Sequence, residues 1–196
     1  MRDLPACDER RLGHRGAIDP RVLRFSGFER LADLGGGHGL LLASVLQKYP
    51  PMQGVLFDLP EVVAGVPADR LAACGGRLRV EAGSFFERVP QGCDAYMMKH
   101  IIHDWSDEHC RTILKLVRDK LPTDGRVLVC EMVVTDEPGP TPAKMLDIEM
   151  LVMTVGGKER TKGEFAELFA SSGLRLSRIV PTERPICAIE AVPGQL

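Results

Sequence analysis

Short apolar runs alternate along this chain with stretches in which apolar residues recur at helical spacing. The runs at residues 31–34, 52–57, 78–80, 92–100 and 126–134 predict strands. Helices are predicted from about residue 38, through residues 71–74, and over residues 107–121, 143–155 and 162–169. Two last apolar stretches, residues 174–180 and 186–191, predict an antiparallel hairpin at the edge of a sheet.

Strands that alternate with helices and end in a hairpin are typical of an α/β three-layer domain with a mostly parallel sheet. Right-handed crossovers bring the carboxyl ends of the parallel strands to one edge of such a sheet. That edge would carry the glycine-rich segment 35–39, Asp58, Ser84 and residues 99–104. We therefore expect all the candidate chemistry to face one crevice.

The sequence Asp33-Leu-Gly-Gly-Gly-His-Gly39 falls where the first strand turns into a helix. Glycines there permit positive φ and let a ligand lie against the backbone beside a helix N-terminus. The spacing is not the G-x-G-x-x-G of dinucleotide binding, because Leu40 follows Gly39 directly. Asp33 would repel a pyrophosphate and suits a cation, such as the amino group of an amino-acid moiety. A purely structural glycine turn is the alternative.

Asp58 ends the second predicted strand, about twenty residues after the glycines. An acidic residue at this place in a βαβ unit accepts hydrogen bonds from ribose hydroxyls. A helix cap before Pro60 is the structural interpretation, and the two roles are compatible. The two features together favour a nucleoside-type ligand.

The end of the fourth strand carries Lys99, His103 and Asp104, and the fifth strand contains a single carboxylate, Glu131. A carboxylate in the interior of a central parallel strand requires a partner or a purpose. A histidine with an ordinary pKa near 6.5 is mostly neutral at cytoplasmic pH and accepts protons. A core or capping histidine is the alternative for His103.

Composition narrows the class of partner. The net charge of -2 gives no reason to expect a nucleic-acid surface, so a small molecule is the expected partner. The six cysteines lack disulfide-like or zinc-like spacing, which predicts buried thiols and no metal site. No signal peptide or membrane-length apolar run is present, so a cytoplasmic protein without membrane contact is expected.

The predicted helix over residues 143–155 has methionines and aliphatic residues around most of its circumference. Core, a pocket wall and a subunit contact are all compatible with this pattern, and core is the default. If the helix lines an acceptor pocket, its methionines favour a flat apolar substrate.

Five motifs, taken in order, resemble those of the S-adenosylmethionine-dependent O-methyltransferases of the caffeic-acid and acetylserotonin type. They are Asp-Leu-Gly-Gly-Gly-His-Gly, Phe-Asp-Leu-Pro, Gly-x-Phe-Phe, Lys-His-Ile-Ile-His-Asp-Trp and Gly-Gly-Lys-Glu-Arg-Thr. The resemblance runs from about Phe28 to Val192. It implies a class I methyltransferase (Rossmann-like) fold, with a seven-stranded sheet in the order 3-2-1-4-5-7-6 and a C-terminal antiparallel hairpin.

The resemblance also implies roles for individual residues. The cofactor S-adenosylmethionine, and its product S-adenosylhomocysteine, would be held by Asp33, Gly35, Gly37, Asp58, Leu59, Ser84, Phe85 and Lys99. His103 would be the general base, with Glu131 and Glu159 as the two carboxylates that hold its imidazole. An aromatic small-molecule acceptor would lie near Asp104, Trp105, Met150, Met153 and Thr154, with no metal.

Two features depart from the family pattern. Ser84 stands where the family usually has an aspartate that contacts the adenine side. Family members also carry a helical domain that forms a homodimer, and residues 1–27 are expected to be an arm or a remnant of it, before a catalytic domain at residues 28–196. Two alternatives to methyl transfer stay open. One is a non-catalytic partner module, and the other is a cofactor-binding homologue that performs hydroxylation or decarboxylation.

Overall fold

The computed structural model describes residue 25, residues 27–182 and residues 184–194. The predicted N-terminal arm lies almost entirely outside the described residues. The strands are β1 (Arg30–Leu34), β2 (Gln53–Asp58), β3 (Leu78–Ala82), β4 (Ala95–Lys99), β5 (Arg126–Val134), β6 (Arg160–Thr161), β7 (Leu174–Pro181) and β8 (Ile186–Pro193). The helices are α1 (Leu40–Lys48), α2 (Pro60–Val63), α3 (Ala68–Ala73), α4 (Asp107–Lys120), α5 (Pro142–Met153) and α6 (Lys162–Ala170), with a 3₁₀ turn η1 (Ile102–Asp104).

The strands form one mixed sheet in the order β3-β2-β1-β4-β5-β8-β7. Strands β1 to β5 are parallel, whereas β8 runs antiparallel to both β5 and β7. The two-residue β6 pairs with the end of β5 beside this path. With β6 left out of the numbering, the order is 3-2-1-4-5-7-6, so the predicted topology and the predicted terminal hairpin are confirmed.

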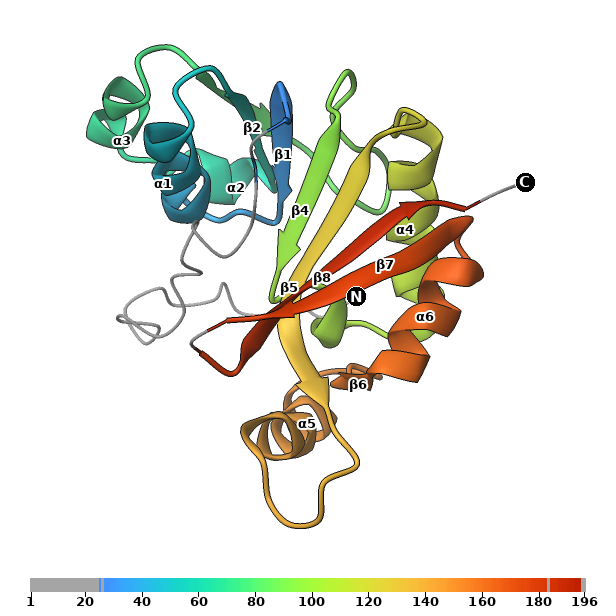
Figure 1. Ribbon diagram of the computed structural model, residues 1–196. Coiled ribbons are helices and arrows are strands. Elements are labelled where there is room, and N and C mark those ends of the chain that lie inside the picture. Colours follow the sequence, from blue (N-terminus) through green and yellow to red (C-terminus); the bar gives the residue numbers. More distant parts are fainter. Residues whose placement is uncertain (1–24, 26, 183, 195–196) are drawn as a thin grey trace.

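Helices cover both faces of the sheet (Figure 1). Helices α1, α2 and α3 lie together beside β1 and β2, and α4 and α6 lie on the opposite side. Leu42 and Leu46 of α1 belong to one buried cluster, and Leu114 of α4 and Phe165 of α6 belong to the other. The central strands are therefore covered on both faces, which explains why their sequences are continuous apolar runs.

Two predicted helix starts and most of the predicted buried thiols are confirmed. The Ser106 side chain accepts from the His109 backbone at the start of α4, and Thr161 and Glu164 form a complete capping box before α6. Cys130 is fully buried, while Cys187 is half-buried. Within the described ranges, no helix combines the length and the apolar content needed to span a membrane.

Helix α5 does not belong to the core, so the default expectation for residues 143–155 is wrong. Ala143 and Met150 are its buried residues, whereas Leu151 and Val152 are each 77% exposed. Figure 1 shows α5 beyond the carboxyl end of β5, away from the other helices. Apolar residues around a whole circumference carry no information about which face is buried, and here most of the circumference is exposed.

Candidate active site

The carboxyl ends of β1 and β2 meet through the glycine-rich turn. Gly35, Gly37 and Gly39 all have positive φ, at 68°, 57° and 75°. The Gly35 N–H donates to the Phe57 carbonyl at 2.8 Å, and the Gly37 N–H donates to Asp58 Oδ2 at 2.8 Å. The predicted turn is confirmed, and glycine is required because the backbone is left-handed at three of its positions.

Asp58 is not a helix cap. The N-cap of α2 is Leu59, and it makes no side-chain capping bond. Asp58 Oδ1 instead accepts from the Leu59 N–H at 2.7 Å, so one carboxylate connects the glycine turn to the segment after β2. Asp58 therefore lies at the predicted place, at the sheet edge beside Gly37.

Asp33 is a buried carboxylate beneath the same turn. It is 2% exposed, and its Oδ2 has no hydrogen-bond partner within the part of the chain that the structure describes. Burial raises the pKa of Asp33 to about 7, partly opposed by the charge of Lys99 and reinforced by that of Asp58. Since an unpartnered buried oxygen is costly, the site favours a ligand that brings a hydrogen-bond donor or a cation.

The segment after β3 reaches the glycine turn through Phe85. A side chain at Gly35 would lie 3.4 Å from the Phe85 ring and 2.4 Å from Ile101 Cδ1. Phe85 also meets the Trp105 ring edge-on at a centroid distance of 6.3 Å. Ser84 has a local role, since its hydroxyl accepts from the Phe86 N–H at 3.2 Å. The ends of β1, β3 and β4 thus converge at one place, as predicted.

His103 lies in η1, just after β4, with 6% of its surface exposed. Its Nδ1 lies 2.6 Å from Glu159 Oε1, and its Nε2 lies 3.5 Å from Asp104 Oδ1. Because a carboxylate only accepts hydrogen bonds, Nδ1 carries a proton, and in the neutral form of the ring Nε2 is the nitrogen that can accept one from a substrate.

The pKa of His103 differs from the expected ordinary value. Burial lowers it, but the hydrogen bond to Glu159 and the charges of Glu131, Asp104 and Glu159 outweigh burial and raise the pKa to about 8. The surroundings of His103 therefore favour the protonated ring, in contrast to the mostly neutral imidazole expected from the ordinary value. At pH 7 such a group is only about one-tenth neutral.

Glu131 does not hold the imidazole, contrary to the role implied by the resemblance. Its Oε1 accepts from the backbone N–H groups of Ile101 and His103, at 3.2 and 3.1 Å. Burial raises the pKa of Glu131 to about 6, and the charge of His103 opposes this rise. Glu131 thus fixes the backbone of the turn, and of the two carboxylates it is Glu159 that forms the hydrogen bond to the ring.

Two further residues, which the sequence did not predict, support the pair formed by His103 and Glu159. Asp147 Oδ1 accepts from the Glu159 N–H at 2.8 Å, which connects α5 to the segment that carries Glu159. Arg160 is fully buried, and its Nη1 donates to the carbonyl of Ile102 in η1 at 3.0 Å. Arg160 lies within a motif of the resemblance and Asp147 lies in α5, but a charged residue in a helix or turn usually indicates an exposed surface.

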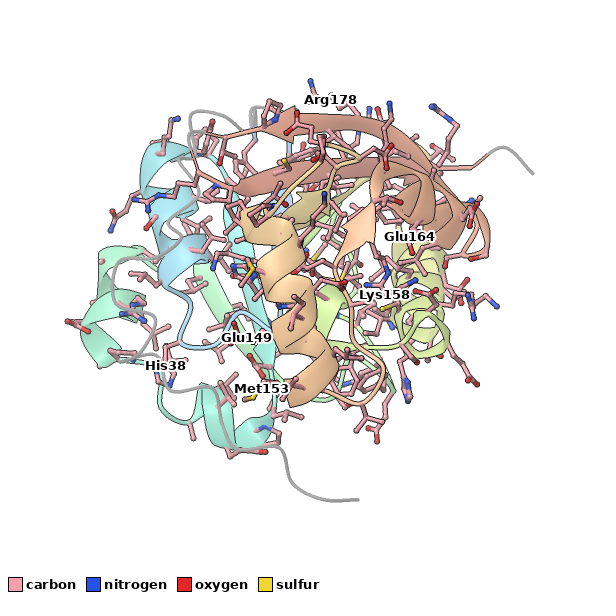
Figure 2. All side chains as sticks on the ribbon, turned by 90° about the horizontal axis from the view of Figure 1, so that it is seen from below. His38, Glu149, Met153, Lys158, Glu164 and Arg178 are labelled. Atoms are coloured by element: carbon pink, nitrogen blue, oxygen red, sulfur yellow. The ribbon has the colours of Figure 1, made fainter. Side chains whose placement is uncertain are left out.

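The three residues predicted from α5 differ in their surroundings. Met150 is buried at 7% exposure, while Met153, at the carboxyl end of α5, is 65% exposed (Figure 2). The Thr154 hydroxyl donates to the Met150 carbonyl at 2.8 Å and accepts from the Gly157 N–H at 2.9 Å. Thr154 therefore connects α5 to the segment that carries Glu159.

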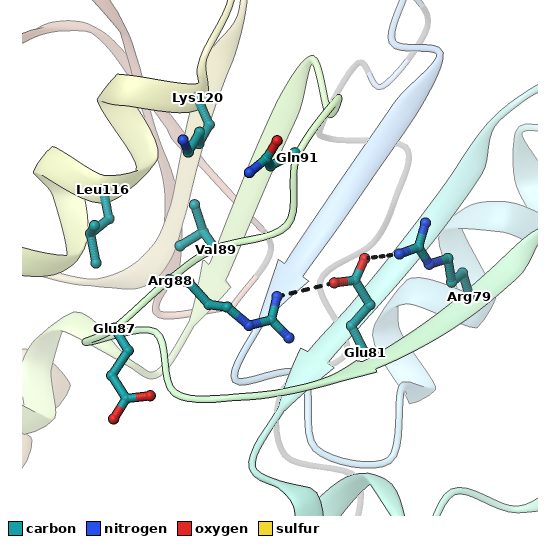
Figure 3. A pocket seen from close by; sticks show the side chains of 8 residues that line it. All are labelled: Arg79, Glu81, Glu87, Arg88, Val89, Gln91, Leu116 and Lys120. Atoms are coloured by element: carbon teal, nitrogen blue, oxygen red, sulfur yellow. Dashed lines mark hydrogen bonds and ion pairs between the residues drawn. The ribbon is translucent and has the colours of Figure 1, made fainter.

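A cavity of about 460 Å³ lies away from these residues, between β3, the segment after it and α4 (Figure 3). Figure 3 shows Arg88 and Arg79 on either side of Glu81, with which both form ion pairs, at 3.2 and 2.8 Å. None of the predicted cofactor or catalytic residues lines it. Among the described residues, no group of three or more histidine, cysteine, aspartate or glutamate side chains is arranged to hold a metal ion.

Comparison with known proteins places the chain in a class. Residues 10–175 match the family model of the O-methyltransferase domain. The chain therefore belongs to the O-methyltransferase domain family, and its fold is that of the class I methyltransferases.

Individual relatives resemble the chain over about half their length. The chain is 39% identical over 171 residues to the phenazine O-methyltransferase PhzM of Lysobacter antibioticus, which covers 86% of this chain and 50% of that protein. The SAH-bound crystal structure of CalO1, a methyltransferase in calicheamicin biosynthesis, aligns with a TM-score of 0.82 at 38% identity, over 91% of this chain and 53% of that one. The structure of NcsB1, from neocarzinostatin biosynthesis, aligns with a TM-score of 0.78 at 30% identity, over 88% and 51%.

Proposed function

We propose that this chain is the catalytic domain of an S-adenosylmethionine-dependent O-methyltransferase that acts on a hydroxyl of an aromatic small molecule. The observation that carries the proposal is the 2.6 Å contact between His103 Nδ1 and buried Glu159, at the sheet edge that also holds the glycine turn and Asp58. CalO1 binds SAH, and NcsB1 binds SAH together with 1,4-dihydroxy-2-naphthoic acid, which supports this cofactor and an aromatic acceptor.

The residues at the turn fit such a cofactor. The unpartnered Oδ2 of Asp33 suits its amino group, and Gly35 leaves open a space that a Cβ would fill against Ile101 and Phe85. Asp58 keeps lone pairs for ribose hydroxyls beyond the two backbone groups it accepts from. We also assign to this cofactor site the residues Gly37, Leu59, Ser84, Phe85 and Lys99.

The chemistry that the cofactor supplies when bound is an electrophilic methyl group on a sulfonium. The protein must then orient the acceptor hydroxyl and remove its proton. His103 Nε2 takes that proton, and Glu159 stabilises the imidazolium that forms. Glu131 keeps the turn in place, and Asp104, Trp105, Met150, Met153 and Thr154 lie near the acceptor.

The test has two stages on the 196-residue chain. Isothermal titration with SAM and SAH should show binding that is lost in Asp58→Ala. Methyl transfer to a panel of aromatic hydroxyls should then be lost in His103→Ala, which should bind SAH as the unchanged protein does.

Product masses separate the alternatives. A gain of one methyl group supports the proposal, whereas a gain of oxygen or a loss of carbon dioxide supports the other chemistry. Full methylation by His103→Ala would refute the assigned base. A folded chain that binds neither SAM nor SAH would favour a non-catalytic partner module.

A further inference from the structure

Arg160 carries a buried charge for which the proposed reaction has no direct use. Its side chain has no exposed surface. Its Nη1 donates to the Ile102 carbonyl at 3.0 Å and to the Lys158 carbonyl at 3.2 Å. Its Nη2 donates to the Trp105 carbonyl at 3.0 Å. Nε and Nη2 both donate to Asp107 Oδ1, at 3.0 and 2.7 Å, which neutralises the guanidinium.

The acceptors of Arg160 flank the base and its carboxylate. Ile102 and Trp105 lie on either side of His103 and Asp104, and Lys158 immediately precedes Glu159. The two segments also meet directly, since the Lys158 N–H donates to the His103 carbonyl at 2.9 Å. One guanidinium therefore connects the segment that carries the base to the segment that carries its partner.

We propose that Arg160 is a positioning residue, which holds the turn carrying His103 and the segment carrying Glu159 at the separation that their hydrogen bond requires. The catalytic importance of this role rests on the proposed function, whereas the positioning of the two segments does not. A lysine cannot replace the arginine here, because one ammonium group cannot reach three carbonyls and a carboxylate in a planar arrangement. Asp107 serves the same arrangement as the charge partner of Arg160.

The surroundings of His103 make its titration a measure of this separation. Glu159 faces Nδ1, Asp104 lies 3.5 Å from Nε2, and Glu131 lies behind the backbone. The His100 ring, at a centroid distance of 5.1 Å, is neutral because burial, with the charges of Lys99 and His103, lowers the pKa of His100 to about 3. If the contact with Glu159 lengthens, burial dominates and the pKa of His103 falls.

The experiment is an NMR titration of the His103 imidazole in Arg160→Lys. We expect its pKa to fall by about one unit from about 8, while the affinity for SAH changes by less than about twofold. The control is Arg178→Lys, since Arg178 (labelled in Figure 2) also pairs with a carboxylate, that of Glu190, at 2.8 Å, but at a half-exposed position on the terminal hairpin. It should leave the titration unchanged.

A second variant keeps the proposal testable if Arg160→Lys does not fold. Asp107→Asn removes the charge partner of Arg160 at a half-exposed position. It should also lower the pKa of His103, but by less than Arg160→Lys does. A folded variant of either kind that is merely less stable, with an unchanged His103 titration, would overturn the proposal. Absence of methyl transfer in the unchanged protein would refute the proposed function and leave this titration result standing.

Discussion

Glu159 is the residue whose replacement tests the site most directly. Glu159→Gln keeps the size of the side chain and an acceptor for His103 Nδ1 but removes the charge. The pKa of His103 is raised from 6.5 to about 8 although burial lowers it. The hydrogen bond to Glu159 is the largest of the effects that raise it, so its loss should lower the pKa by an amount on the order of 1.5 units, or about 2 kcal/mol of imidazolium stabilisation.

The effect on rate should depend on pH. Above pH 9 both proteins hold a neutral imidazole, and the less stable imidazolium should lower kcat by about 6- to 30-fold. At pH 6.5 about 3% of the unchanged protein is neutral against about 50% of the variant, which offsets that loss. The two pH profiles should therefore converge on the acid side, with the midpoint of the variant about 1.5 units below that of the unchanged protein.

The assay is initial-rate methyl transfer from SAM to the best acceptor between pH 6 and 9.5, with NMR titration of His103. Glu190→Gln is the control, since Glu190 is also buried but pairs with Arg178 on the terminal hairpin. A loss of rate by one constant factor at every pH would refute the reasoning. An unchanged His103 pKa in the variant would refute it as well.

Two further outcomes follow from other parts of the site. Because the pKa of Asp33 is raised to about 7, the ionised fraction of its carboxyl group rises about tenfold from pH 6 to pH 8. The affinity for SAH, measured by calorimetry, should rise by a similar factor. Asp33→Asn should abolish this dependence on pH. Gly157→Ala would place a Cβ 2.4 Å from the His103 carbonyl oxygen, so it should lower the free energy of unfolding in urea by about 1–3 kcal/mol. In Gly163→Ala the nearest neighbour is 3.9 Å away, and the same measurement should show no loss.

The fold was predictable because its signals are local. Continuous apolar runs identify the buried parallel strands, and glycines with positive φ mark the turn after β1. Helix α5 shows the limit of such signals. Its apolar residues are compatible with burial or exposure, and the choice depends on what lies beyond the end of β5, which periodicity does not record.

The residues of the site were predictable, but their contacts were not. A resemblance assigns Glu131 and Glu159 one shared role, since both are carboxylates close to His103. Their division depends on the η1 turn, which exposes two backbone N–H groups to Glu131 and leaves the ring to Glu159. Arg160 was missed because its burial arises from contacts 53 to 58 residues away in the chain.

Asp33 and His103 both hold protons near neutral pH, and this couples their titration to ligand charge. Their pKa values are raised to about 7 and about 8, so at pH 7 Asp33 is about half protonated and His103 about nine-tenths. A cation bound nearby lowers both values, so it must release protons.

SAM and SAH share the amino group that we assign to Asp33, but SAM alone carries the sulfonium. Calorimetry in buffers of different ionisation enthalpy should therefore show more protons released by SAM than by SAH, and His103→Gln should remove the difference. Equal release by both ligands would contradict a sulfonium site beside His103.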